Sequence, residues 1–272
     1  TDPVISWPKG LIGQLMILDH INQFGGPNAF YERYCHNERD GAYHLDELRR
    51  KLRILGCIWR TQDEINNKPA KIEYSYYPIP LTNREDYDRY EKLIDTGKKD
   101  LSYRLQPLRM ILGKQKIQPA IQWIKAWLND NTGQKVLVIA YYIDVMNGLA
   151  SGLNGLLINS STSDHQREVR LQKFRDDPTA RVLVLGMNTI LWNPEVDFVR
   201  TIIFVENAYT PGNEDRIIKY LQNGRDNGTI RVISLYCPNT IDIGIGSLND
   251  KKRYVIKTLK FRRQPPDSSE SY

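Results

Sequence analysis

The side chains capable of covalent or metal chemistry are few and widely spaced in this sequence. It contains no Gly-x-Ser-x-Gly motif, and none of its four histidines has a partner at the spacing of a catalytic triad. His165 follows a helix-capping residue, which favours an exposed position on a helix. Cys35 and His36, with His44, come nearest to a zinc-binding spacing, but we expect no metal there. The glycines at residues 244–246 lack the strand and helix of a dinucleotide-binding turn. The sequence therefore predicts no catalytic residue of these classes.

Positive charge is the more informative property. The chain of 272 residues has 38 basic side chains and a net charge of +6, which suits a polyanionic partner. Residues 251–263 hold seven cations and no acid, beginning with Lys251, Lys252 and Arg253. A second basic group, at residues 49–53, lies on a predicted helix and either forms a solvated face or meets phosphates.

Five short apolar runs follow one another between residues 135 and 237. They lie at residues 136–140, 156–158, 182–185, 202–205 and 230–235, and they are too short and too β-branched for helices. Helical spacing occurs between most of them, at residues 144–153, 164–174 and 214–222. Parallel strands need crossover connections, which usually contain helices. The pattern therefore predicts an α/β fold with a parallel sheet covered by helices on both faces.

The residues before this sheet are mostly helical by pattern. Apolar spacing predicts helices at residues 9–23, 44–55, 83–94, 101–112 and 117–128, with Pro107 interrupting the fourth. Residues 57–60 and 71–77 are predicted strands.

The location of the protein is constrained by what the sequence lacks. No apolar run approaches the roughly 18 residues that would span a bilayer, and no signal peptide is evident. Three widely spaced cysteines argue against a disulfide framework and favour a reducing, intracellular compartment, either cytoplasmic or nuclear.

Short sequence words within the predicted sheet occur in a characteristic order. Residues 136–145 read VLVIAYYIDV, residues 158–163 read INSSTS, residues 174–178 read FRDDP, and residues 239–242 read NTID. In this order they resemble the second RecA-like lobe of the Swi/Snf-type helicase-like ATPases. Words upstream, such as those at residues 24–26 and 59–61, resemble the end of the first lobe of that family.

The resemblance implies a division of the chain into four parts. Residues 1–80 would be a remnant of the first lobe with a helical protrusion, and residues 81–130 a helical bridge or insertion. Residues 131–260 would form the second RecA-like lobe, and residues 261–272 a tail.

The family's catalytic motifs are incomplete in this sequence. Neither the phosphate-binding G-x-x-x-x-G-K-[ST] loop nor an acidic Mg²⁺-binding box occurs. Tyr220 and Asn223 stand where the resemblance places the two arginine fingers, and Arg216 and Arg225 are the possible substitutes. The family also has a glycine-rich motif, and residues 188–194 stand in its place here with bulky residues such as Leu191. We therefore expect no catalytic residue and no cofactor of its own; ATP and Mg²⁺ would require an upstream lobe, and Thr1 in place of Met suggests preceding residues.

The resemblance also implies that duplex DNA lies against the hydroxyl-rich word. Small hydroxyls and helix N-terminal N–H groups suit phosphate oxygens, and nearby cations would add affinity. The candidates for DNA binding are Ser160, Ser161, Thr162, Ser163, Arg167, Lys173, Lys251, Lys252 and Arg253.

Three functions remain open at this point. The first is a catalytically degenerate helicase-like module that binds DNA or acts as a scaffold. The second is the C-terminal portion of an active ATP-dependent DNA translocase. The third is a structural subunit that docks a protein partner through aromatic side chains, since the chain has 16 tyrosines.

Overall fold

The computed structural model describes residues 7–35, 42–56, 70–95, 101–187, 189, 196–223 and 228–259. The chain forms two compact units. Unit 1 comprises Thr1–Pro69, Thr210–Gly212 and Leu248–Tyr272, and unit 2 comprises Ala70–Tyr209 and Asn213–Ser247. Three predicted segments lie outside the described residues. They are the strand at 57–60, the tail at 261–272 and the segment of bulky residues at 190–194.

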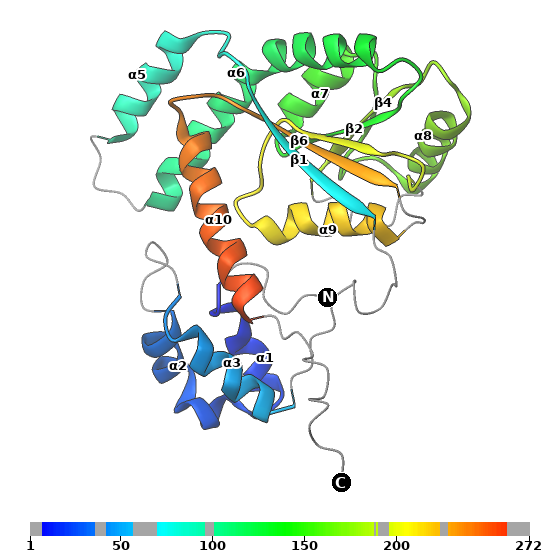
Figure 1. Ribbon diagram of the computed structural model, residues 1–272. Coiled ribbons are helices and arrows are strands. Elements are labelled where there is room, and N and C mark those ends of the chain that lie inside the picture. The colour runs from blue at the N-terminus through cyan, green and yellow to red at the C-terminus, as the bar shows by residue number, and fades with distance from the viewer. Residues whose placement is uncertain are drawn as a thin grey trace. The chain divides into compact units, whose positions relative to one another are not determined.

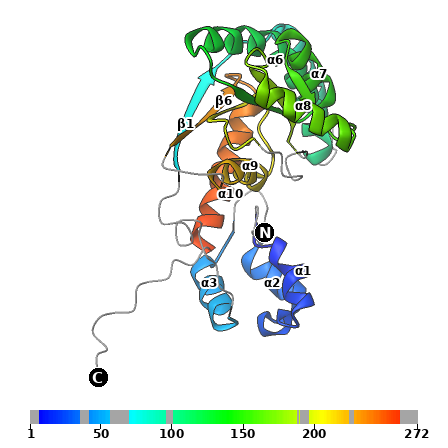
Figure 2. The same ribbon diagram turned by 90° about the vertical axis from the view of Figure 1, so that its right-hand side faces the viewer.

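Unit 2 is built on a six-stranded sheet in which every neighbouring pair is parallel, in the order β1-β6-β5-β2-β4-β3. This confirms the predicted α/β fold. Figures 1 and 2 show β1 beside β6 at one edge. The strands are β1 (Lys71–Pro78), β2 (Val136–Ala140), β3 (Leu156–Ile158), β4 (Val182–Gly186), β5 (Thr201–Phe204) and β6 (Thr229–Tyr236).

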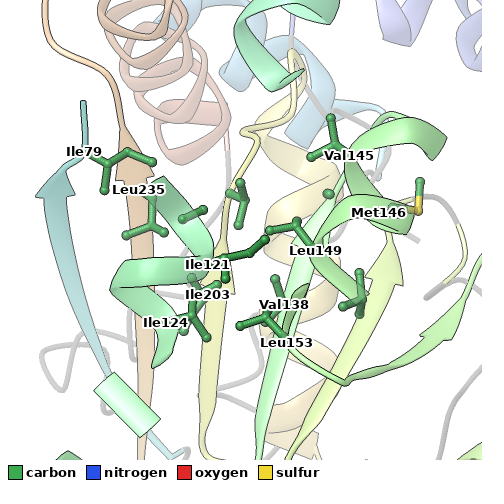
Figure 3. Packing of buried hydrophobic residues seen from close by; sticks show 14 of the residues in the cluster. Ile79, Ile121, Ile124, Val138, Val145, Met146, Leu149, Leu153, Ile203 and Leu235 are labelled. Atoms are coloured by element: carbon green, nitrogen blue, oxygen red, sulfur yellow. The ribbon is translucent and has the colours of Figure 1, made fainter. Parts of the chain in front are cut away.

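Helices cover both faces of this sheet, as expected for parallel strands. On one face, α6 (Leu101–Asp130) and α7 (Ile143–Gly152) pack on alternate strand residues such as Val138 and Ile203. Figure 3 shows Ile121 and Ile124 of α6 and Leu149 of α7 converging on those strands.

The opposite face of the sheet is covered by α8 (Asp164–Asp176) and α9 (Pro211–Asn223). They pack on the other alternate strand residues, including Leu137 and Ile139. Because both faces are covered, β2 and β4 are fully buried, which explains their unbroken apolar sequences.

Two features of unit 2 differ from the sequence expectations. The strand at Lys71–Pro78 was grouped with residues 1–80, but its backbone pairs residue by residue with β6, so it belongs to the same sheet as the predicted lobe. Helix α6 continues through Pro107 instead of breaking there. Leu108 and Leu112 follow Pro107 and are buried against the sheet, so packing outweighs the roughly 3 kcal/mol cost of an interior proline. The assignment of these segments as lobe remnant and bridge stays a prediction.

Helices α5 (Arg84–Asp95) and α10 (Ile241–Leu259) complete the described elements of unit 2. Residues of α10 from Leu248 onward belong to unit 1. No helix in the described part of the chain is both long enough and apolar enough to cross a bilayer.

Unit 1 is helical. It contains α1 (Gly10–Ile17), a 3₁₀ turn η1 (Ile21–Phe24), α2 (Gly26–Tyr34), α3 (Leu45–Ile54) and the last part of α10. A single helix was predicted at residues 9–23, but the chain turns at Asp19, whose φ of 55° lies in the left-handed region. Phe24, Phe30 and Tyr34 form the centre of the core, with ring centroids 5.0 to 6.1 Å apart.

Glu47 of α3 bonds to two residues of α2, and these bonds make the stability of the fold depend on pH. Its carboxylate accepts hydrogen bonds from Arg33 Nε (3.0 Å) and Tyr34 Oη (2.8 Å), and these, Arg33 first, lower its pKa to about 2. A lowered pKa stabilises the fold above the ordinary value near 4.5, and that contribution disappears as the pH falls toward 2.

In acid unfolding, we therefore expect the stability difference between wild type and Glu47→Gln to shrink from about pH 5 to about pH 2. Glu32→Gln, an exposed substitution on α2, is the matched control. A wild-type advantage that stays constant over this range would contradict the prediction.

Candidate functional site

The carboxyl ends of β2 and β5 form the topological switch point of the sheet. From β2 the chain passes through α7, on one face of the sheet, toward β3 at one edge. From β5 it passes through α9, on the other face, toward β6, which lies in the direction of the other edge. β2 and β5 are direct neighbours. In open parallel sheets, ligands bind in the crevice outside the strand ends at such a point. The loops that follow β2, β5 and β3 all meet this carboxyl edge.

Glu206 occupies the switch point. It comes two residues after β5, is 6% exposed, and its Oε2 accepts the backbone N–H of Tyr141 (2.7 Å) and of Tyr142 (3.0 Å). Tyr142 is the residue before α7, so this carboxylate lies at the positive end of that helix. Burial raises the pKa of Glu206, while the two N–H donors and the charges of Lys116 and Arg109 oppose that rise.

Helix α6 closes over Glu206 from one side. Arg109 donates a hydrogen bond to Asn207 O (2.8 Å), and its guanidinium lies 5.2 Å from the centroid of the Tyr141 ring. Gly113 faces the carboxylate so closely that a Cβ there would lie 2.4 Å from Glu206 Oε1. The glycine thus permits the close approach of α6 to the acid.

A second acid, with a side chain that is 10% exposed, lies farther along the same edge. Asp242, at the start of α10, accepts hydrogen bonds through Oδ2 from Lys116 Nζ (2.9 Å) and Cys237 N (2.9 Å). The Lys116 side chain is 1% exposed, and its Nζ also donates to Leu235 O (2.7 Å). This ion pair joins α6 to the end of β6.

The hydroxyl-rich motif at residues 158–163 forms an ordered loop between β3 and α8. The Oδ1 of buried Asn159 accepts from Ser161 N (3.0 Å), Ser161 Oγ (2.7 Å) and Thr162 Oγ1 (3.2 Å). Ser163 caps α8 by accepting from Gln166 N (3.3 Å). Ser160 and Ser161 are exposed at the carboxyl edge, next to the N-terminus of α8.

The other predicted DNA-binding residues differ in how far they reach solvent. Thr162 is buried and its hydroxyl is engaged with Asn159, so it supports the loop instead of facing outward. The Arg167 side chain is 15% exposed and pairs with Asp164 (3.3 Å), while Lys173 is exposed.

The basic run lies apart from the loop in the chain, in unit 1. Lys251 is exposed and Arg253 is half-buried, but Lys252 is buried, with its Nζ 5.9 Å from the centroid of the Trp7 ring. Lys252 therefore helps to pack unit 1, because its aliphatic stem covers apolar surface.

The arginine-finger positions lie on α9. Arg216, Tyr220 and Asn223 share one stripe by their spacing of four and three residues, and Tyr220 packs partly against the sheet core. The possible substitute Arg225 and the side chain of Asn223 lie outside the described residues. Arg216 is half-buried, one helical turn before Tyr220.

Sequence reasoning missed Glu206, Gly113 and the pair of Lys116 with Asp242. The available signal was an acid directly after an apolar strand, at Glu206. Among the described residues, no group of three or more His, Cys, Asp or Glu side chains gathers in a metal-binding arrangement.

Comparisons with known proteins identify the fold. No family model and no curated protein matches the sequence. The structure is similar to the C-terminal part of the Fun30 ATPase domain, with 12% identity, a TM-score of 0.55, and coverage of 71% of this chain and 97% of that one. It is also similar to the SWI2/SNF2 ATPase core domain of Sulfolobus solfataricus, with 16% identity, a TM-score of 0.56, and coverage of 92% of this chain and 58% of that one. The chain therefore has the RecA-like, helicase-like fold of a Swi/Snf-type C-terminal lobe, as the sequence predicted.

Proposed function

We propose that this chain, with the fold of a Swi/Snf-type ATPase lobe, is a helicase-like module that binds duplex DNA and has lost the lobe's catalytic arginines. The observation that carries the proposal is the loop at residues 159–163. It presents the exposed residues Ser160 and Ser161 at a helix N-terminus, and the buried Asn159 side chain supports the loop through three hydrogen bonds.

The loop is suited to phosphate oxygens. Ser160 can donate its hydroxyl, and the first N–H groups of α8 lack carbonyl partners within the helix. Asp164, the acid of that first turn, is paired with Arg167, which reduces its repulsion of phosphate. Because the loop is ordered by internal bonds, little conformational entropy is lost when DNA binds.

The loss of catalysis rests on the residues of α9. Tyr220 contacts the core at the position where the resemblance places an arginine. Its neutral phenol cannot balance the negative charge of a triphosphate as a guanidinium does. Arg216 keeps the translocase alternative open, since it lies on the same stripe of the helix. In that alternative, ATP and Mg²⁺ would be held by an upstream lobe.

A docking role is the second candidate, favoured by the edge strand. Among the described strands, β1 pairs with β6 alone, and Tyr74 and Tyr76 are 50% and 59% exposed on it. Exposed aromatics at a sheet edge suit a protein partner. Either role fits a reducing intracellular compartment, where the buried thiols of Cys35 and Cys237 would persist.

The proposed function is tested by titrating the chain with a fluorescent duplex at several salt concentrations. If about four phosphates are contacted, affinity should fall about a hundredfold between about 50 and about 200 mM salt. A single-stranded oligonucleotide of the same length is the comparison ligand. No binding at the lowest salt, or binding that salt does not weaken, would contradict the proposal.

A further inference from the structure

Tyr141, the first residue after β2, has an aromatic ring that is held in place without being buried. Its ring centroid lies 5.1 Å from that of Tyr142, with 79° between the ring planes, and 5.2 Å from the guanidinium of Arg109. Its backbone N–H donates to Glu206. The residue is nevertheless 40% exposed. An exposed ring in a fixed orientation is a surface on which a second flat group can stack.

Asn207 lies near this ring and supplies a hydrogen-bond acceptor. Its backbone carbonyl accepts from Arg109 (2.8 Å), whose guanidinium also contacts the Tyr141 ring. The residue is half-buried, and its side-chain Oδ1 is buried with no hydrogen-bond partner in the described part of the chain. A buried oxygen without a donor costs free energy, so the carboxamide would be stabilised by turning toward the amino group of a ligand.

A flat group that carries an amino donor fits both features. Nucleobases have this chemistry, because every base has a face that stacks on aromatic rings and adenine, guanine and cytosine each carry an exocyclic amino group. The bases of an intact duplex are stacked on one another and paired, so a base must be unpaired to meet the ring.

The order of the strands places Tyr141 within reach of the DNA-binding loop at residues 159–163. Strand β4 alone separates β2, which precedes Tyr141, from β3, which precedes the loop. Two strand spacings put the carboxyl ends of β2 and β3 about 10 Å apart. This is about three base steps along a DNA strand, so one strand can contact the loop and the ring together.

We propose that Tyr141 and Asn207 form a binding site for an unpaired nucleobase at the carboxyl edge of the sheet. Tyr141 stacks on the base, Asn207 accepts a hydrogen bond from its amino group, and Arg109 contacts both residues. The inference rests on the proposed DNA binding for the source of the base, which is an unpaired end or gap beside the duplex. A free nucleotide is the other source of the same chemistry.

The test compares three DNA ligands that share one duplex: a blunt form, a form with a short adenine overhang, and a form with an abasic overhang of equal length. The two overhangs carry the same phosphates, so their difference in affinity measures the bases. Wild type should bind the adenine overhang about tenfold more tightly than the abasic one. Tyr141→Leu should lose this difference and Tyr141→Trp should keep it. Tyr76→Ala, which removes a tyrosine that is 59% exposed on β1, is the matched control and should behave as wild type.

The amino group is tested with Asn207→Ala, which keeps the backbone carbonyl that Arg109 contacts. Wild type should prefer an adenine overhang about fivefold over one of unsubstituted purine, which lacks the amino group, and Asn207→Ala should not discriminate. If Tyr141→Leu does not fold, this variant decides: an unchanged preference for adenine would overturn the site.

The same titrations separate failure of this inference from failure of the proposed function. Binding of the blunt duplex with equal affinity for the two overhangs would overturn the inference and leave DNA binding intact. If no DNA binds, a fluorescent aminopurine riboside decides, because stacking on the ring quenches its emission. Quenching by wild type and not by Tyr141→Leu supports the site with a free nucleotide as its source, and no quenching by wild type overturns it.

Discussion

Asp242→Ala is expected to lower the free energy of unfolding by about 3–5 kcal/mol, the largest loss among the substitutions considered. The Lys116 side chain is 1% exposed and its ammonium lies 2.9 Å from the Asp242 carboxylate. Without the acid, the carbonyl of Leu235 is the one partner left to the ammonium among the described residues, and the N–H of Cys237 loses its acceptor. A buried charge and a buried donor are then left with too few partners. Chemical denaturation, monitored by circular dichroism, measures the effect.

Asp250→Ala is the matched control on the same helix. Asp250 is 77% exposed and lies 3.7 Å from Arg253, so its pair is expected to contribute less than about 1 kcal/mol. Lys116→Met together with Asp242→Ala should recover part of the loss, since the uncompensated charge is then removed. A loss for Asp242→Ala no greater than that for Asp250→Ala would contradict the prediction.

Changing both Ser160 and Ser161 to Asp is expected to weaken duplex DNA binding by roughly 30- to 150-fold, or about 2–3 kcal/mol. Both serines are exposed beside the N-terminus of α8, where the proposal places phosphate oxygens. Two carboxylates there would repel the phosphates and occupy the helix N–H groups. Fluorescence anisotropy at low salt measures the affinity.

The control for this substitution carries the same change in charge. Gln118→Glu with Gln122→Glu alters two exposed positions on α6, away from the loop in the chain. This control should bind DNA within a few-fold of wild type, since distant exposed charges are screened. Equal weakening by the two double variants would show a general charge effect and contradict a role for the loop.

The fold was largely predictable because buried parallel strands have a distinctive composition. The apolar run at residues 136–140 matches β2, and those at 202–205 and 230–235 match β5 and β6 within one residue at either end. β1 was harder to place, because the exposed residues of an edge strand, such as Tyr74, carry no sign of their partner. The continuation of α6 through Pro107 depends on tertiary packing, which local propensity does not contain.

The candidate site was predictable only in part, for a similar reason. The exposure of residues Ser160 and Ser161 and the cap at Ser163 follow from their place before a helix. The inward direction of Thr162 does not, because its role depends on the side chain of Asn159. Glu206 was missed because its partners are backbone N–H groups after another strand, and only the parallel arrangement of β2 and β5 brings them together.

Hydrogen exchange with and without duplex DNA tests the central claim most directly. The proposal predicts that DNA slows exchange at the amides of residues 160–166, which form the loop and the first turn of α8. Amides within β2 and β4, already buried in the sheet, should change little. Bound DNA that leaves the amides of residues 160–166 unprotected would contradict the account.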